Sequence, residues 1–501
     1  MLACRGTNRG GIVQAMSSTV SRRGFLAASA FSIVPRRVLG APFIPPSDKI
    51  TLACVGTGTQ GLREMLPLLG SEKIRVVAVC DPCRDATGYR DWSPTGLLQS
   101  LRAGLNKPAW RAGTEHAIPG GLTAGKDLTD SWYGNKDCAA YADFRELLEK
   151  HKDLDAVKIM TPDHLHGVAS IAAMKRGKHV IMHKPIANRL QEAREVIAAA
   201  KASGVATHFM PWDTNGSMEK IMSWIHGGAI GKLREIHNWT NRPVWPQFAD
   251  IPKDRPPVPE GFDWDLWLGP EADRPYHPNY THMVFRGWFD FGGGAMADMG
   301  HYSLWSVFRA LELSGPSVVE PQLSRHVAFD GNSIARGKNT HSFPDASVVR
   351  FRYPTLDLVW HEGGMRPPVP EELAREDKDL PAEGMLFIGE RGTILSGFRL
   401  ENPRLLSEKQ VEAPSARARR ERNQLSPGLE QWVAACKGGK QSPGSFLTAG
   451  GISEAVNLYA VALRTQQKLR WDAAAGQCTN SAEANRYLSR EYRKGWDPKT
   501  I

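Results

Sequence analysis

The sequence is poor in cysteine, has no long apolar run and contains no internal repeat or low-complexity tract. Seven cysteines in 501 residues do not indicate a disulfide scaffold, and a bond between Cys80 and Cys83 is the less favoured interpretation of their C-x-x-C spacing. A membrane-spanning helix needs about 20 consecutive apolar residues, and no segment of this sequence contains such a run. These absences favour a globular protein, and a chain of 501 residues is long enough for two domains.

The charge distribution argues against nucleic acid as a partner. The net charge is +10, yet six arginines and no acidic residue occupy residues 1–41, so the rest of the chain carries only +4. The short basic stretch Arg417–Arg422 lies among Ser, Ala and Glu, which is typical of a solvated loop. No basic run is interleaved with aromatic residues, as it is on surfaces that bind single-stranded nucleic acid.

The N-terminal arginines fit an export signal. Residues Ser21–Leu26 read S-R-R-G-F-L and precede the short apolar run Ala27–Val34 and the small residues that end at Ala41. Twin arginines before a weakly hydrophobic stretch predict a Tat-type signal peptide over residues 1–41, with export to the periplasm and no stable membrane anchor. A basic tail without a signal function is the alternative.

Strand and helix patterns alternate between residues 48 and 210. The apolar runs typical of strands are Ile50–Val55, Ile74–Cys80, Ala156–Met160, His179–Met182 and Val205–Phe209. Their alternation with helical periodicity predicts an α/β fold, with a Rossmann dinucleotide-binding domain over residues 48–210. The segment 85–137 breaks this alternation and is too long for an ordinary connection, so we expect an insertion that runs over the surface.

From about residue 211 the pattern changes to alternating strands. Strand patterns occur at Lys232–Thr240, Ala346–Trp360, Met385–Ile388 and Thr393–Ser396, and helical patterns at Gly428–Cys436 and Ile452–Gln466. They predict an α+β domain with a mostly antiparallel sheet over residues 211–470, which supplies the substrate contacts, and a C-terminal segment over 471–501. The helix at Ile452–Gln466 is expected to return to the first domain.

A glycine-rich loop directly follows the first strand pattern. Residues Gly56, Thr57, Gly58, Thr59, Gln60 and Gly61 form G-x-G-x-x-G and open a helical stretch. Here the first glycine permits a tight turn, the second lets the backbone approach a pyrophosphate, and the third lets helix and strand pack closely. Asp81, 20 residues beyond Gly61, is placed to accept hydrogen bonds from the adenosine ribose. This favours NAD over NADP, although Arg84 leaves NADP possible.

Ionisable residues follow the later strands, at the edge where open α/β sheets bind ligands. The residues Thr161–His166 follow one strand pattern, and His183–Pro185 follow the next. Farther along, a short glycine-rich stretch contains Asp298, His301 and Tyr302. If this stretch is helical, Asp298 and Tyr302 share one face and His301 lies beside them.

These motifs resemble those of the Gfo/Idh/MocA oxidoreductases, from about residue 50 to about residue 496. The resemblance rests on the glycine loop, on T-P-x-x-x-H at Thr161, Pro162 and His166, on the G-K-H-V-x-x-x-K-P run that ends at Pro185, and on the G-G-G-x-x-x-D-x-G element that contains Asp298. It implies a Rossmann domain joined to a mainly antiparallel sheet domain. It also implies NAD or NADP as the cofactor, no metal, and oxidation or reduction of sugar or cyclitol hydroxyls.

Two positions depart from the family pattern. His183 stands where the family has an acidic residue before the lysine, and Tyr302 stands where a catalytic histidine is usual. The residues carried over by position are Lys184, Asp298 and Tyr302 as catalytic groups, with Thr161, Pro162, His166 and Lys184 beside the nicotinamide. His301 is the alternative base. Tyr302 serves as the base only if a cation such as Lys184 lowers its pKa from about 10.

Three functions are consistent with these residues. The first is an NAD(P)-dependent oxidoreductase that acts on a secondary hydroxyl of a sugar, glycoside or cyclitol. The second retains NAD and cleaves glycosides through a transient 3-keto sugar, by oxidation, elimination and reduction. The third and least favoured is a sugar-binding protein without catalysis. We expect a homo-oligomer, a dimer or a tetramer.

A metal site is not expected. Five histidines lie near the strand ends, at positions 164, 166, 179, 183 and 208. A zinc site needs three or four ligands in tetrahedral geometry, whereas alternate residues of a strand point to opposite faces of the sheet.

Overall fold

The computed structural model describes residues 48–85, 88–112, 118–209, 217–324, 328–330, 332–335, 339–406 and 424–501. Residues 47–501 form one compact unit. The predicted signal peptide and the stretch Arg417–Arg422 lie outside the described residues. In the part of the chain that is described, no helix combines the length and the apolar composition that a membrane span requires.

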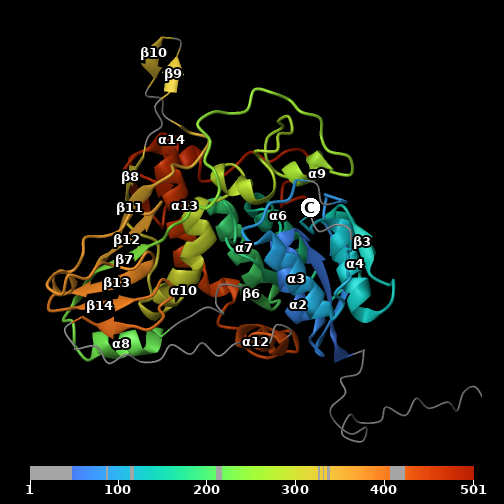
Figure 1. Ribbon diagram of the computed structural model, residues 1–501, viewed down its shortest axis with the longest axis horizontal. Helices are drawn as coiled ribbons and strands as arrows, with labels where there is room; N and C mark the ends of the chain where they lie inside the picture. Colours follow the sequence, from blue (N-terminus) through green and yellow to red (C-terminus); the bar gives the residue numbers. More distant parts are fainter. Residues whose placement is uncertain are drawn as a thin grey trace, which may run out of the picture. The chain divides into compact units, whose positions relative to one another are not determined.

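The first sheet has six parallel strands in the order β3-β2-β1-β4-β5-β6. Its two outer strands, β3 and β6, are labelled in Figure 1. The strands are β1 (Ile50–Val55), β2 (Ile74–Cys80), β3 (Ala139–Tyr141), β4 (Ala156–Ile159), β5 (His179–Met182) and β6 (Thr207–Phe209). Nearly all side chains of β1, β4 and β5 are buried, because helices cover both faces of a parallel sheet. The strand order reverses between β1 and β4, and this switch point is where doubly wound sheets bind ligands. The predicted Rossmann fold is confirmed.

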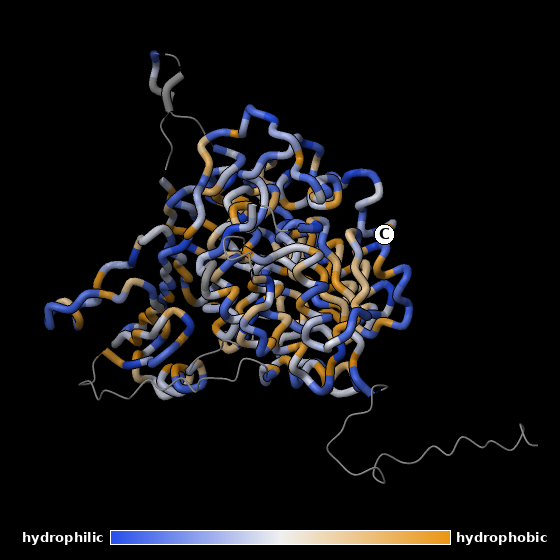
Figure 2. Tube along the Cα trace, turned by 45° about the vertical axis from the view of Figure 1, so that its right-hand side comes forward, coloured by the Kyte–Doolittle hydropathy of each residue, from blue (hydrophilic) through white to orange (hydrophobic). Residues whose placement is uncertain are grey.

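Helices cover the two faces of this sheet. One apolar cluster joins one face to α2 (Thr59–Leu69), α3 (Pro94–Leu105), α4 (Leu122–Tyr133) and α12 (Pro427–Cys436). The other cluster joins the opposite face to α5 (Phe144–Lys150), α6 (Asp163–Lys175) and α7 (Leu190–Ser203). Hydrophobic residues follow the strands and the inner helix faces, and hydrophilic residues follow the outer loops (Figure 2). In α12, Trp432 donates its indole N–H to the Ala206 carbonyl at 3.3 Å, so this late helix returns to the first domain.

The segment 85–137 is more regular than the sequence predicts. It contains α3 and α4, of 12 residues each, and α4 leads directly into β3. Pro94 occupies the first turn of α3, where proline is tolerated, and Asn106 ends α3 in the left-handed conformation. Gly134 ends α4 in the same way. Pro94 therefore marks the start of α3 and Gly134 the end of α4, whereas Gly96, Gly104 and Gly125 lie inside these helices. The described residues of the segment belong to the connection between β2 and β3.

The second sheet has nine strands in the order β15-β14-β13-β7-β12-β11-β8-β16-β17. Its strands are β7 (Leu233–Trp239), β8 (Val318–Leu323), β11 (Ser347–Arg352), β12 (Asp357–Glu362), β13 (Gly384–Gly389), β14 (Thr393–Ser396), β15 (Arg404–Leu405), β16 (Leu469–Asp472) and β17 (Gln477–Cys478). Only β7 and β12 pair in parallel, so the mostly antiparallel sheet is confirmed. The expected strand at Ala346–Trp360 is two strands, because a turn from Tyr353 to Leu356 separates β11 from β12. The predicted boundary at residue 470 falls within β16.

The remaining described elements are short helices and connections. They comprise a two-stranded ribbon of β9 (Ala328–Asp330) and β10 (Ser333–Ala335), the helices α8 (Met218–His226), α9 (Trp264–Leu268), α11 (Glu371–Ala374) and α14 (Ala482–Arg486), and the 3₁₀ turns η4 (His282–Gly287) and η6 (Phe446–Thr448). The connection from residue 242 to η4 brings side chains of the second domain to the first sheet, and this connection therefore bears on function.

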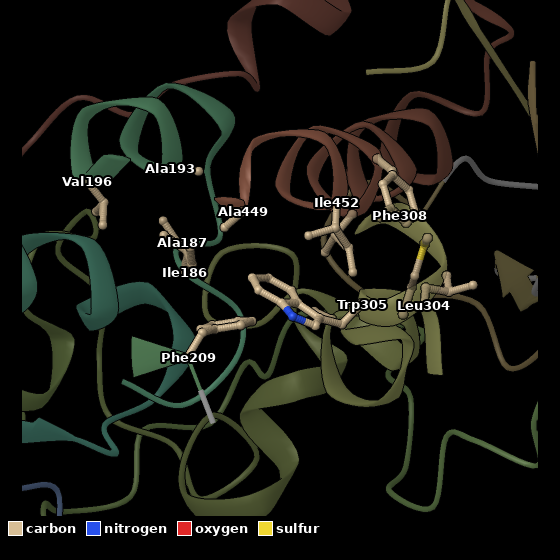
Figure 3. Close-up of a cluster of buried hydrophobic side chains, with 14 of the residues drawn as sticks. Ile186, Ala187, Ala193, Val196, Phe209, Leu304, Trp305, Phe308, Ala449 and Ile452 are labelled. Atoms are coloured by element: carbon tan, nitrogen blue, oxygen red, sulfur yellow. The ribbon is translucent and has the colours of Figure 1, made fainter. Parts of the chain in front are cut away.

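Two helices join the sheets. The first, α10 (His301–Ala310), follows a π-helical turn, η5 (Met296–Gly300), and the second is α13 (Gly450–Thr465). Helix α13 contacts α10, α7 and β8, and thereby links the first domain to the second sheet, as expected for this helix. In Figure 3 the rings of Phe209 and Trp305 face each other across this joint, with Ile452 beside them. This core fixes α10, and with it the side chains at the start of α10, against the carboxyl ends of β5 and β6.

Candidate functional site

The glycine loop has the geometry of a dinucleotide turn. Gly56 adopts φ +91°, and a Cβ at this position would lie 2.5 Å from the backbone of Met160. A Cβ on Gly61 would lie 2.3 Å from the Gly56 carbonyl oxygen. Both positions therefore require glycine, for the turn and for the close packing of α2 on β1. Helix α2 begins at Thr59, so its free N–H groups face the space above the loop, where they favour an anion.

A pocket opens above this loop. Its walls come from the glycine loop and Asp81, from the strand-end residues Met160, Thr161 and Pro162, from Tyr89 and Trp92 of the 85–137 segment, and from Trp267, His282, Phe285 and Arg286 of the second domain. The glycine turn, the helix N-terminus and the aromatic walls fit a nicotinamide dinucleotide.

Aromatic rings from both domains meet over this pocket. The rings of Tyr89 and His282 lie 4.0 Å apart between their centres, and Phe262 packs on the other side of His282 at 6.0 Å. Cys83 forms a β-bridge with Phe262, and the Arg84 N–H donates to the Gly261 carbonyl at 2.7 Å. The second domain thus closes the side of the pocket next to Cys83 and Arg84.

Asp81 lies at the pocket wall and is already hydrogen-bonded to protein. Its carboxylate accepts the backbone N–H of Thr57 at 2.8 Å and that of Cys83 at 2.9 Å. Burial raises the pKa of Asp81 to about 6, although these two hydrogen bonds oppose the shift. Its neighbours Cys80 and Cys83 are not joined by a disulfide bond. Asp81 therefore fixes the glycine loop from the end of β2, and its contact with the ribose stays a prediction.

Of the three residues predicted after β4, two reach the pocket. Thr161 and Pro162 line it. His166 is buried on α6, with Nδ1 at 2.5 Å from the Pro185 carbonyl and Nε2 at 2.9 Å from the Thr161 carbonyl. Burial lowers the pKa of His166. Because both ring nitrogens face backbone oxygens, His166 fastens the loops after β4 and β5 to each other, and it is not among the residues that line the pocket.

Lys184 and Asp298 meet as the sequence predicts. Lys184 follows β5, is 3% exposed, and its ammonium contacts the Asp298 carboxylate directly. Burial lowers the pKa of Lys184, and Asp298 opposes that shift. Burial alone would raise the pKa of Asp298, but Lys184, Arg286 and Arg242 outweigh it and hold this pKa well below its usual range. The Asp298 carboxylate and its neighbouring cations therefore lie beside the pocket, because one of these cations, Arg286, lines it.

The π-helical turn separates His301 from the other two candidates. Its wider winding replaces the regular helix expected through this stretch. Asp298 and Tyr302 face Lys184, whose Nζ lies 5.6 Å from the centre of the Tyr302 ring. His301 packs edge-on against Phe209 at 5.2 Å, and its Nδ1 lies 3.1 Å from the Ala297 carbonyl. Burial lowers the pKa of His301 to about 3. The structure thus places His301 in the core between the domains.

Tyr302 hydrogen-bonds to His183, with 2.7 Å between Oη and Nε2. The guanidinium of Arg399 lies 4.4 Å from the centre of the Tyr302 ring. Burial raises the pKa of Tyr302, and the charges of Glu64 and Asp298 raise it further, while Arg399 and Arg286 oppose the shift. The cations that lower the pKa of Tyr302 are thus these two arginines rather than Lys184, which is engaged by Asp298, and burial outweighs them.

Three polar residues to which the sequence analysis gave no role extend the chain of polar contacts that begins at Tyr302. His183 Nε2 lies 3.3 Å from Glu64 of α2, and Lys158 of β4 pairs with the other Glu64 oxygen at 2.7 Å. Lys158 is 1% exposed. Burial lowers the pKa of His183 to about 3. For Glu64, burial is outweighed by Lys158 and His183, which lower its pKa to about 2.

We call Tyr302, His183, Glu64 and Lys158 the buried relay. At neutral pH it consists of a tyrosine hydroxyl, a neutral imidazole, a carboxylate and an ammonium group in contact. A lysine inside the otherwise apolar strand A-V-K-I was the signal in the sequence that a buried acidic partner must exist. Its partner, three residues beyond Gly61, is not identifiable from spacing alone.

No metal centre is evident in the described ranges, which contain no group of three or more His, Cys, Asp or Glu side chains arranged to hold an ion. The histidines near the strand ends have separate partners. His164 Nε2 contacts the Trp267 carbonyl at 2.8 Å, His179 accepts the Ala206 N–H at 2.9 Å, and His208 contacts the Ser442 hydroxyl at 3.0 Å.

Two family models match the chain in succession. Residues 124–210 match the NAD-binding Rossmann fold of an oxidoreductase family, and residues 222–322 match the C-terminal α/β domain of the same family. The matches therefore cover the parts of both domains that carry Thr161, Lys184 and Asp298. NAD is the cofactor of this Rossmann fold.

Curated relatives match over shorter segments. A 1,5-anhydro-D-fructose reductase from Ensifer adhaerens is 45% identical over 12% of this chain and 18% of its own length. A scyllo-inositol 2-dehydrogenase (NADP(+)) from Bacillus subtilis is 38% identical over 19% of this chain and 29% of its own. A glycosyl hydrolase family 109 protein from Shewanella pealeana is 23% identical over 42% of this chain and 40% of its own. The chain thus spans less than half the length of each of these relatives.

Proposed function

Because the chain belongs to the Gfo/Idh/MocA family of oxidoreductases, we propose that it oxidises or reduces a secondary hydroxyl of a sugar, glycoside or cyclitol with NAD. One observation carries the proposal: Lys184, Asp298 and the hydrogen-bonded pair Tyr302–His183 converge beside the dinucleotide pocket. The similar proteins named as a sugar reductase and a cyclitol dehydrogenase support this substrate class.

Alcohol oxidation needs a group that takes the hydroxyl proton while hydride leaves the carbon. The bound nicotinamide would supply the hydride acceptor. Lys184 would orient the substrate hydroxyl and stabilise the negative charge that develops on its oxygen. Asp298 holds the Lys184 ammonium in place through their direct contact.

The buried relay makes Tyr302 usable despite its raised pKa. In the tautomer that leaves His183 Nε2 unprotonated, Tyr302 donates its hydroxyl hydrogen bond to that nitrogen. Tyr302 would then accept the substrate proton while its own proton passes to His183. The imidazolium that results would lie 3.3 Å from the Glu64 carboxylate, which approaches the same nitrogen and offsets the new positive charge. The reverse transfer serves reduction.

The test uses the purified protein with NAD and a panel of sugars, cyclitols and aryl glycosides. We expect NADH to form with at least one panel member, and Lys184→Ala to abolish that signal while NAD still binds. A protein that fails to bind NAD, or a Lys184→Ala variant with unchanged turnover, contradicts the proposal and favours a sugar-binding protein.

Glycoside cleavage is the second candidate. It is supported by the similarity to a glycosyl hydrolase family 109 protein and by the Tyr89–His282 contact that closes over the pocket from both domains, as a retained cofactor would require. On this route the hydride returns to the sugar after elimination. The discriminating measurement is aglycone release in many turnovers per NAD without accumulation of NADH.

We also propose export through a Tat-type signal. The proposal is supported by the order S-R-R-G-F-L at Ser21–Leu26 and by the short apolar run that follows. Replacing Arg22 and Arg23 by Lys is expected to retain the precursor in the cytoplasm, and the exported form is expected to begin near Ala41. Unchanged recovery of the double variant from the periplasm contradicts a Tat route.

A further inference from the structure

Three cations share one carboxylate at the candidate catalytic site. Asp298 contacts the ammonium of Lys184, lies 3.3 Å from Arg286 Nε and lies 3.9 Å from Arg242 Nε. The three cations come from the loop after β5, from η4 and from the connection after β7. Since one carboxylate balances one cation, this group carries excess positive charge.

A fourth cation lies on the neighbouring side chain. Arg399 stacks its guanidinium over the Tyr302 ring at 4.4 Å from the ring centre. Two further carboxylates act on these cations. The charge of Asp163 raises the pKa of Lys184, and Glu401 accepts the Arg399 backbone N–H at 2.8 Å, so the four cations outnumber the three carboxylates by one. Glu64 is matched by Lys158.

The cations differ in exposure. The Lys184 side chain is 2% exposed, whereas the side chains of Arg242 and Arg286 are 26% and 18% exposed, and Arg399 is likewise half-buried. The lysine is thus enclosed against Asp298, whereas the three arginine side chains are partly exposed. Like charges held close together repel one another, so such a group is most stable with an anion between its members. Guanidinium groups match carboxylate and phosphate oxygens with paired hydrogen bonds.

We propose that the substrate is an anionic sugar, one that carries a carboxylate or a phosphate group, and that Arg242 and Arg399 bind this group. The inference rests on the proposed function in one respect, that the sugar ring lies next to Lys184. Arg286 lines the dinucleotide pocket and is therefore also placed to contact the cofactor, whereas Arg242 and Arg399 do not line that pocket.

The test compares matched ligands on the full-length purified protein by titration calorimetry, with and without NAD. Glucuronate, glucose 6-phosphate and glucose share a ring and differ in charge. We expect at least one of the two anions to bind about tenfold or more tightly than glucose, the scale of a charge-assisted hydrogen bond. Which anion binds more tightly identifies carboxylate or phosphate as the recognised group. The preference is expected to weaken as salt is added.

Two variants assign the preference to the arginines. Arg242→Gln and Arg399→Gln are each expected to remove most of the preference for the anion and to leave NAD affinity unchanged. Arg352→Gln is the matched control, because Arg352 lies on β11 and pairs with Glu320 at 3.0 Å. Equal or tighter binding of glucose overturns the proposal. A loss of NAD affinity with the anion preference intact also overturns it, because the cations would then serve the cofactor.

The same titrations separate this proposal from the proposed function. An anionic sugar that binds through Arg242 and Arg399 without any redox or cleavage reaction sustains the inference and contradicts the enzymatic function. NADH formation from neutral sugars alone, without a preference for anions, sustains the function and overturns the inference.

Discussion

The dinucleotide pocket and the buried relay differ in how the chain builds them. The glycine loop consists of consecutive residues between β1 and α2, and its shape follows from the absence of side chains at Gly56 and Gly61. The relay gathers Glu64 from α2, Lys158 from β4, His183 from the end of β5 and Tyr302 from α10. A backbone turn tolerates no added atom, whereas a buried charge network tolerates no unmatched charge. Substitutions in the glycine loop are therefore expected to disturb the backbone, whereas substitutions in the buried relay are expected to leave a charge unmatched.

The largest expected effect is on turnover at Lys184. Lys184→Ala is expected to lower turnover by about a hundredfold or more, the scale for loss of an electrostatic or proton-handling group, while NAD affinity stays nearly unchanged. Steady-state kinetics and NAD titration measure the two quantities. Lys178→Ala is the matched control, since Lys178 follows α6 and its ammonium donates to the Lys152 carbonyl at 2.7 Å. A parallel loss of NAD binding would mean that the two regions are not separable.

The next largest effect is expected at Glu64, on both the free energy of unfolding and turnover. Glu64→Gln leaves Lys158 buried without its counter-ion, which is expected to cost about 3–5 kcal/mol of unfolding free energy. Adding Lys158→Met should recover much of this stability without recovering turnover, because His183 still lacks its carboxylate. Denaturant unfolding and kinetics distinguish the two. Glu454→Gln, which breaks the 2.6 Å pair with Arg194, is the control with unchanged turnover. Restored turnover in the double variant would reduce Glu64 to a structural role.

The pH dependence of that stability has a defined sign. The pKa of Glu64 is about 2 in the folded protein, below the value of about 4.3 in an unfolded chain. Its contribution is therefore complete above about pH 5 and is lost as the pH falls toward 2. The stability difference between the unaltered protein and Glu64→Gln is expected to shrink over this window. A constant difference from pH 7 to pH 3 contradicts the assigned shift.

A smaller effect separates Tyr302 from His301. Tyr302→Phe removes the hydroxyl that hydrogen-bonds to His183 and is expected to lower turnover by about tenfold or more. His301→Asn alters a buried ring against Phe209, so it is expected to lower the thermal midpoint with little change in turnover per folded molecule. Kinetics normalised to folded protein decide between them. The reverse outcome would make His301 the base.

The smallest effect concerns cofactor choice. NAD is expected to bind more tightly than NADP, and Asp81→Ala should narrow the difference by removing the charge that repels a 2′-phosphate. Because the pKa of Asp81 is raised to about 6, the carboxylate is neutralised as the pH falls through 6, and the preference should decline between pH 7 and pH 5. Fluorescence titration with both cofactors measures it. Equal affinities of the unaltered protein at pH 7.5 contradict the role of Asp81.

The sequence by itself determined the local features. Apolar runs located every strand of the first sheet except β3, and alternation located the central strands of the second sheet but not β8, β15, β16 or β17. G-x-G-x-x-G located the turn, because such patterns depend on residues that are near one another in the chain. Lys184 and Asp298 were also identified in advance, from motif positions that the structure brings into contact. The helices α3 and α4 of the 85–137 segment were not recognised, since glycines occur inside both of them.

Only the tertiary structure decided which side chains share a pocket. Residues 301 and 302 are adjacent, yet the π-helical turn and the packing on Phe209 direct His301 into the core and Tyr302 toward His183. Glu64 and Lys158 are 94 residues apart, and the convergence of Arg242, Arg286 and Arg399 involves still more distant segments. Spacing along the chain carries no information about such contacts, because they are set by how the two sheets pack on α10 and α13.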